Sequence, residues 1–115
     1  MSMLSMQYAG TLMGREAVID FPDSHADVRY GLQGQMVWRV VDALGHVSEG
    51  CEQVGYLQLS DSLHFLNWRE SSGFTVSQFI DTAQGAVQAF WSCADARSQG
   101  GHRASMFVQG HFRLR

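Results

Sequence analysis

The fold class is decided by the stretch RASMFVQGHFRL, residues 103–114. Every second residue belongs to an apolar set, and the residues between them are polar or charged, with Phe107 as the exception. This repeat of two is typical of a β-strand with one buried face, whereas an amphipathic helix would repeat at about 3.6 residues. The apolar face therefore consists of Ala104, Met106, Val108, Gly110, Phe112 and Leu114.

Earlier segments alternate in the same way and are separated by short breaks that contain glycine. In residues 26–32, for example, Val28, Tyr30 and Leu32 alternate with Asp27 and Arg29. Segments rich in Val, Phe, Trp and Thr between tight turns indicate successive antiparallel strands. We expect strands near residues 14–20, 26–32, 35–41, 46–59, 63–70, 74–81, 86–94 and 103–114.

Eight sequential strands in a single domain, residues 1–115, predict an all-β, antiparallel, up-and-down barrel, because closure hides the edges of the sheet. A two-sheet sandwich is the alternative, but its crossovers call for longer connections than most of those here. We expect a short helical turn within residues 2–8. A barrel of eight strands has room for packed side chains or for one small ligand.

Composition excludes several functions. The chain has eight arginines, no lysine and a net charge of −3, without a basic stripe, so nucleic-acid binding has little support. The missing lysine excludes a Schiff-base mechanism and a P-loop. No apolar run reaches the roughly 20 residues that span a bilayer, and the N-terminus does not resemble a signal peptide. We therefore expect a cytoplasmic protein that binds neither membrane nor nucleic acid.

The cysteines and histidines do not predict a bound cofactor. Cys51 and Cys93 are too few for a disulfide scaffold and lack metal-ligand spacing, so we expect them to be reduced and packed in or near the core. The five histidines include no HxH or HExxH pair. A histidine metal site would have to be assembled across neighbouring strands, so we predict no metal and no cofactor.

The segment FLNWRESSGFTV, residues 65–76, carries the strongest functional signal. Alternation places Glu70 on the same face as Leu66 and Trp68, so Glu70 faces the barrel interior if they do. A carboxylate there is costly unless it is paired, hydrogen-bonded or protonated. Glu70 either contacts a ligand or lies at the rim, bonded to the amides of Ser72 or Gly73.

The spacing Trp68-x-Glu70-x-x-Gly73-x-x-Val76 resembles the W-x-E-P-T-G-T-x-V segment of bacterial phenolic acid decarboxylases. It is also similar to a strand of the MoaF-like proteins, a lipocalin-like (calycin) family named for a link to molybdenum cofactor biosynthesis. That second resemblance runs from Leu12-x-Gly14 to the final strand. It implies a calycin barrel, and the decarboxylase resemblance implies that Glu70 is a general acid.

The chain departs from the decarboxylase pattern at several positions. It has no counterpart of the G-R-W-V stretch that carries the carboxylate-binding arginine, and Tyr8 stands alone where those enzymes have paired tyrosines. The missing arginine could be replaced only by Arg39, Arg69 or an arginine of the last strand. Alternation predicts that each of these faces outwards. The resemblance thus supports a shared fold and a similar lumen more than a shared reaction.

Three hypotheses for the function follow. The leading one is a barrel that binds a small, largely apolar or aromatic molecule, with Glu70 as the main polar contact, although the same rings could simply fill the interior. The second is a non-oxidative lyase with Glu70 as general acid. The third is a scaffold that forms a homodimer through Phe65, Phe79, Phe90 and Phe107 on the outer face. The rings expected to line the ligand site are Tyr30, Trp38, Tyr56, Trp68 and Trp91.

Overall fold

The computed structural model describes residues 10–70, 73–94 and 103–115, and this part of the chain is all-β. It contains no helix long and apolar enough to span a bilayer. The helical turn expected within residues 2–8 lies outside the described residues. The strands are β1 (Glu16–Phe21), β2 (Ser24–Tyr30), β3 (Gln35–Asp42), β4 (Val47–Gln53), β5 (Gly55–Gln58), β6 (Leu63–Arg69), β7 (Thr75–Asp81), β8 (Ala86–Ala94) and β9 (Arg103–Leu114).

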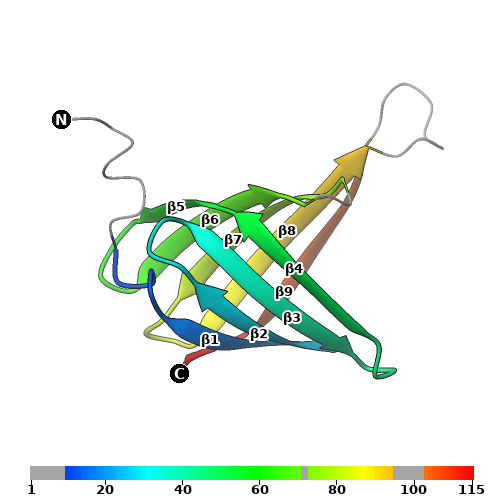
Figure 1. Ribbon diagram of the computed structural model, residues 1–115, viewed down its shortest axis with the longest axis horizontal. Helices are drawn as coiled ribbons and strands as arrows, with labels where there is room; N and C mark the ends of the chain where they lie inside the picture. The colour runs from blue at the N-terminus through cyan, green and yellow to red at the C-terminus, as the bar shows by residue number, and fades with distance from the viewer. Residues whose placement is uncertain (1–9, 71–72, 95–102) are drawn as a thin grey trace.

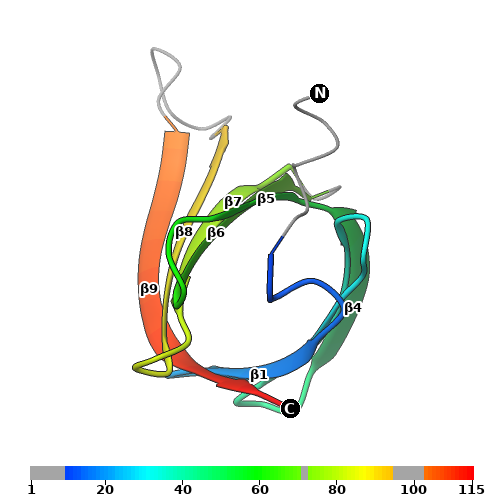
Figure 2. The ribbon, with the colours of Figure 1, turned by 90° about the vertical axis from the view of Figure 1, so that its left-hand side faces the viewer.

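All of these strands belong to one antiparallel sheet that curls into a nearly closed barrel (Figures 1 and 2). The order across the sheet is β4-β3-β2-β1-β9-β8-β7-β6-β5, so every strand except β4 pairs with the strand that follows it, and β1 also pairs with β9. Ala17 stands opposite Leu114 in that last pairing, and Asp20 stands opposite His111. The predicted antiparallel barrel is confirmed.

The expected strand at residues 46–59 is two strands, which makes nine instead of eight. The chain changes partner at Val54: β4 pairs with β3, whereas β5 pairs with β6. The Val54 side chain is buried, and its N–H donates to the carbonyl of Gly34 over 2.8 Å. Strands β4 and β5 are therefore the two edges of the sheet, and β4 faces β6 across a seam.

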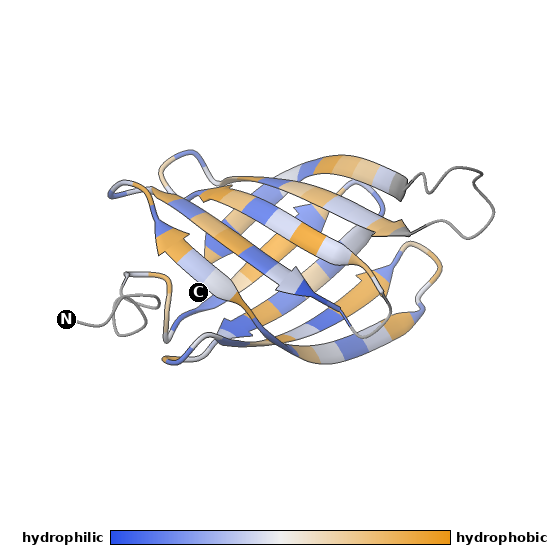
Figure 3. Ribbon diagram, turned by 90° about the horizontal axis from the view of Figure 1, so that it is seen from above, coloured by the Kyte–Doolittle hydropathy of each residue, from blue (hydrophilic) through white to orange (hydrophobic). Residues whose placement is uncertain are grey.

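Alternation along the strands separates an apolar lumen from a largely polar exterior, and Figure 3 shows it as blue and orange bands along the ribbons. In β9, Phe112 is buried, and Phe107 is 58% exposed on the outer face, as the pattern predicts. Met106 was expected to be buried but is 49% exposed. The cause is that β8 and β9 run past their neighbours, since β7 pairs only as far as Ser92 and β1 only as far as His111.

One end of the lumen is filled by residues 10–15, the N-terminal segment that the structure describes before β1 (Figure 2). Leu12 and Met13 are buried in the core cluster, and the N–H of Leu12 donates to the Tyr56 hydroxyl over 3.4 Å. That hydroxyl lies 2.8 Å from Nδ1 of His64, whose side chain is 1% exposed. The Tyr56 hydroxyl and the His64 ring therefore share a hydrogen bond inside the barrel, and its direction depends on the tautomer of the imidazole. Burial lowers the pKa of His64 and raises that of Tyr56.

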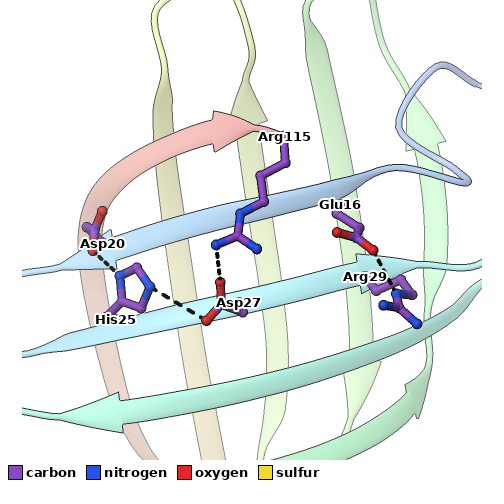
Figure 4. Close-up of polar contacts among 6 residues, drawn as sticks. All are labelled: Glu16, Asp20, His25, Asp27, Arg29 and Arg115. Carbon is purple, nitrogen blue, oxygen red and sulfur yellow. Dashed lines mark hydrogen bonds and ion pairs between the residues drawn. The ribbon is translucent and has the colours of Figure 1, made fainter.

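Outside the barrel, charged side chains connect the C-terminus to the first hairpin (Figure 4). Arg115 lies 3.2 Å from Asp27, and His25 lies between Asp20 at 2.6 Å and Asp27 at 3.6 Å. These groups are largely exposed, so each pair contributes little to stability. The closure of β1 on β9 therefore depends mainly on backbone pairing and on the packing inside.

That closure requires a glycine at position 110. A Cβ there would lie 2.5 Å from the carbonyl oxygen of Asp20 and 2.8 Å from the Phe21 ring. The substitution Gly110→Ala should therefore lower the free energy of unfolding by about 1–3 kcal/mol, because backbone atoms must shift. Gly55→Ala is the matched control, since its Cβ would meet only the Asn67 carbonyl at 3.6 Å. Equal losses in urea denaturation of the two variants would contradict this prediction.

The buried imidazole of His64 predicts acid sensitivity. Its pKa is lowered in the folded state, so below about pH 6.5 the unfolded chain takes up a proton that the folded chain excludes. The contribution of neutral His64 to the free energy of unfolding is therefore fully present above about pH 6.5. It decreases as the pH falls below that value, by at most about 1.4 kcal/mol per pH unit. Urea denaturation between about pH 8 and pH 5 should show a shallower fall for His64→Gln than for wild type. The exposed His111→Gln should retain the wild-type slope, and identical slopes in all three proteins would refute the role of His64.

Candidate functional site

The end of the lumen opposite the N-terminal segment holds a cavity of about 210 Å³, which we call the tryptophan cavity. Its walls come from strands on every side of the barrel, and most of them are apolar. Small side chains on β2 and β4 leave room for larger rings that enter from the other strands. The lining residues are Ile19, Phe21, Ala26, Val28, Met36, Trp38, Val40, Ser48, Trp68, Glu70, Phe74, Gln78 and Trp91.

All three tryptophans of the chain line this cavity. Trp38 in β3 stands opposite Gly50 in β4, and a Cβ on Gly50 would lie 2.5 Å from the indole ring, so the indole packs directly over that glycine. Trp68 in β6 is buried. Trp91 in β8 meets Phe21 edge to face, with ring centroids 6.0 Å apart. The structure thus brings together three of the rings that the sequence predicts for a ligand site.

Glu70 also lines the cavity, directly after the end of β6. Trp68 donates its indole N–H to Glu70 Oε1 over 3.4 Å. The following turn is closed by the backbone, because the N–H of Gly73 donates to the carbonyl of Glu70 and Gly73 has a positive φ of 98°. The Gly73 amide therefore bonds the main chain of Glu70, and the carboxylate is oriented by an indole.

Two further polar groups were not singled out from the sequence. Glu52 in β4 accepts the indole N–H of Trp38 over 3.4 Å, which repeats the pairing of Trp68 with Glu70. Gln78 in β7 lines the cavity with its side chain 6% exposed, and its buried Oε1 has no hydrogen-bond partner among the described residues. Alternation places Gln78 between the buried Val76 and Ile80, and this inward position is the signal that could have identified it.

Tyr30 and Tyr56 face the interior, but they do not line the tryptophan cavity. Tyr56 belongs to the filled end, with Leu12 and His64. Tyr30 is 1% exposed, its hydroxyl has no partner among the described residues, and burial raises its pKa far above the ordinary value. Alternation predicts correctly that these rings point inward, but it does not give their depth along the barrel axis.

The arginines near the site point away from it, as the alternation predicts. Arg39 and Arg69 are exposed, and Arg39 pairs with Glu49 on the outer surface over 3.3 Å. No arginine or histidine among the described residues lines the tryptophan cavity. In the same part of the chain, no group of three His, Cys, Asp or Glu side chains is placed to hold a metal ion.

Aromatic side chains also gather on the outer surface. Phe65 and Phe79 are paired neighbours on β6 and β7, with ring centroids 4.9 Å apart, and Phe90 on β8 stands opposite Phe107 on β9. Phe79, Phe90 and Phe107 are all more than 40% exposed. We refer to these four residues as the phenylalanine face.

Comparison with known proteins agrees with this architecture. A solved protein from Burkholderia vietnamiensis, named "putative beta-lactamase", superposes with a TM-score of 0.75 and 17% sequence identity, over 91% of this chain and 96% of that one. At this identity the likeness shows the fold alone. No curated protein matches the chain. The model of the family described as MoaF-like matches residues 13–103, which span strands β1 to β8 and the start of β9. The chain therefore belongs to the MoaF-like family.

Proposed function

We propose that this protein binds a small, largely apolar or aromatic molecule in the tryptophan cavity, with Glu70 as the main polar contact. The supporting observation is the convergence of all three tryptophans and one carboxylate on a cavity of about 210 Å³. Ligand pockets in proteins are mostly apolar, with a few polar groups that fix the orientation of the ligand. The lining of this cavity has that composition.

The volume of the cavity indicates the size of the ligand. An apolar protein cavity of about 150 Å³ binds benzene, so 210 Å³ accommodates one aromatic ring with a short substituent. Indole and phenyl walls favour a flat ligand, since offset and edge-to-face ring pairs add about 0.5–1.5 kcal/mol beyond burial. We therefore propose a single-ring ligand.

Lyase chemistry is the alternative, and it has less support. Glu70 is positioned to meet a ligand, but a decarboxylase also has to hold the substrate carboxylate, and no described lining residue is basic. The beta-lactamase activity in the name of the Burkholderia protein has little support for this chain either. Serine beta-lactamases of class A use a Ser-x-x-Lys motif, and this chain contains no lysine.

We also propose that the chain forms a homodimer through the phenylalanine face. The outward residues between these rings, Ser77 and Gln88, are uncharged. A two-fold interface brings the same patch of both copies together, so a patch without charge avoids repulsion from its copy. Leu57, exposed and opposite Phe65, extends the apolar row.

A cytoplasmic location completes the proposal. The expectation that both cysteines pack in or near the core is wrong for Cys51, which is exposed on the outer side of β4, whereas Cys93 is half-buried. Neither forms a disulfide. Free thiols of this kind persist in reducing compartments, which supports the cytoplasm.

Tryptophan fluorescence reports directly on the proposed site, because every tryptophan lines it. Titration with single-ring phenols, amines and carboxylates, and with hydroxycinnamates, fatty acids and small lactones, should give a saturable change for at least one series. Ala26→Leu fills the cavity and should weaken that binding at least tenfold. Val37→Leu, an exposed outer residue of β3, should bind as wild type does. No saturable change in any series would remove the proposal, and so would unaltered binding by Ala26→Leu.

Size-exclusion chromatography with light scattering tests the homodimer. The wild-type chain of 12.8 kDa should elute with twice that mass, and Phe79→Ser with the mass of a monomer, because the variant places a polar group at the interface. Leu44→Ser removes an even more exposed apolar side chain from the turn after β3 and should remain dimeric. A monomeric wild type, or a dimeric Phe79→Ser, would rule out this interface.

A further inference from the structure

Two polar side chains that line the tryptophan cavity, Glu70 and Gln78, carry hydrogen-bond acceptors. Glu70 presents a carboxylate, and the buried Oε1 of Gln78 has no partner among the described residues. Two of the three indole N–H groups already donate to carboxylates, Trp38 to Glu52 and Trp68 to Glu70. A ligand that satisfies the cavity must therefore bring donors of its own, since a buried acceptor without a partner is costly.

Among the described residues that line the cavity, the charge has one sign. Glu70 is the one ionisable side chain among its described lining residues, and Glu52 lies behind Trp38. The nearby arginines Arg39 and Arg69 face the outer surface. In a partly desolvated site this arrangement attracts a cation and repels a carboxylate, because Coulomb interactions strengthen as water is excluded.

The walls suit a cation as well. Five rings surround the space, namely Phe21, Trp38, Trp68, Phe74 and Trp91. The face of an aromatic ring is negative, and tryptophan is the aromatic side chain that binds cations best. Aromatic cages of this kind recognise ammonium groups in other proteins. The cavity therefore has the two features that ammonium recognition needs, aromatic faces and a carboxylate.

From this combination we infer that the tryptophan cavity selects a protonated amine attached to a small aromatic or apolar body. Glu70 pairs with the ammonium group, Gln78 Oε1 accepts one of its N–H bonds, and the rings enclose the remainder. This inference rests on the proposed binding function and specifies the chemical class of the ligand.

A benzyl series tests the inference, because its members share one ring and differ in the charge of one substituent. Benzylamine is cationic at neutral pH, benzyl alcohol is a neutral donor, and benzoate is an anion. Tryptophan fluorescence and calorimetry should give benzylamine a dissociation constant at least tenfold below that of benzyl alcohol, with benzoate the weakest. Benzyltrimethylammonium, which cannot donate an N–H, should bind more weakly than benzylamine if Gln78 contributes.

Glu70→Gln isolates the charge, since the amide oxygen still accepts the indole N–H of Trp68. The tenfold preference for amine over alcohol should fall to about twofold or less in this variant. The matched control, Glu49→Gln, removes an exposed carboxylate on the outer side of β4 and should keep the full preference.

Each outcome of the benzyl series has a distinct meaning. Benzyl alcohol that binds as tightly as benzylamine, or benzoate that binds most tightly, overturns the amine inference and leaves the binding function standing. A preference for amine that survives in Glu70→Gln overturns the role of Glu70. The absence of binding by every member, together with every series of the wider titration, overturns the binding function itself and the inference with it.

Discussion

The pairing of β1 with β9 joins the two halves of the chain, with Ala17 opposite Leu114, and it turns a row of hairpins into a ring. The other pairings connect strands that follow one another in sequence, and they would form equally well in an open sheet. Only closure gives the alternating side chains an inside, which the apolar residues of every strand then share. The two strands lie far apart in the sequence, so bringing them together costs chain entropy. The burial of apolar side chains in the closed lumen offsets that cost. Gly110, packed against the backbone of Asp20, lets the two strands approach closely enough.

Side-chain volume then divides the lumen into a filled half and a hollow half. At the filled end Leu12, Tyr30, Tyr56 and His64 occupy the space, and the N-terminal segment closes it. At the other end Ala26, Ser48 and Gly50 are small, and the tryptophan cavity remains among the surrounding rings. Both halves contain a buried polar atom without a partner among the described residues, the Tyr30 hydroxyl at the filled end and Gln78 Oε1 at the hollow end.

The sequence predicts the fold well and the site in part. Alternation identifies the strands and their inward residues because it is a local property of the extended backbone, and it holds for Phe107 and Phe112. It misses the division of residues 46–59 at Val54, since a change of partner is a tertiary event. It also groups Tyr30 and Tyr56 with the tryptophans, although only the register of neighbouring strands determines which inward residues share a level. Glu52 and Gln78 are overlooked because their importance comes from what lies opposite them.

The seam between β4 and β6 has a consequence for how the interior can change. A fully hydrogen-bonded barrel has a circumference fixed by its number of strands and its shear, so a wider lumen requires a new register throughout. Here the ring is interrupted at one place, beside Trp38 and Ser48 on one side and Trp68 on the other. Because no strand pair is formed across this seam, β4 can move relative to β6 while its own pairs with β3 remain intact. Substitutions on β4 would then change the width of the lumen beside Ser48 without changing the strand order of the barrel.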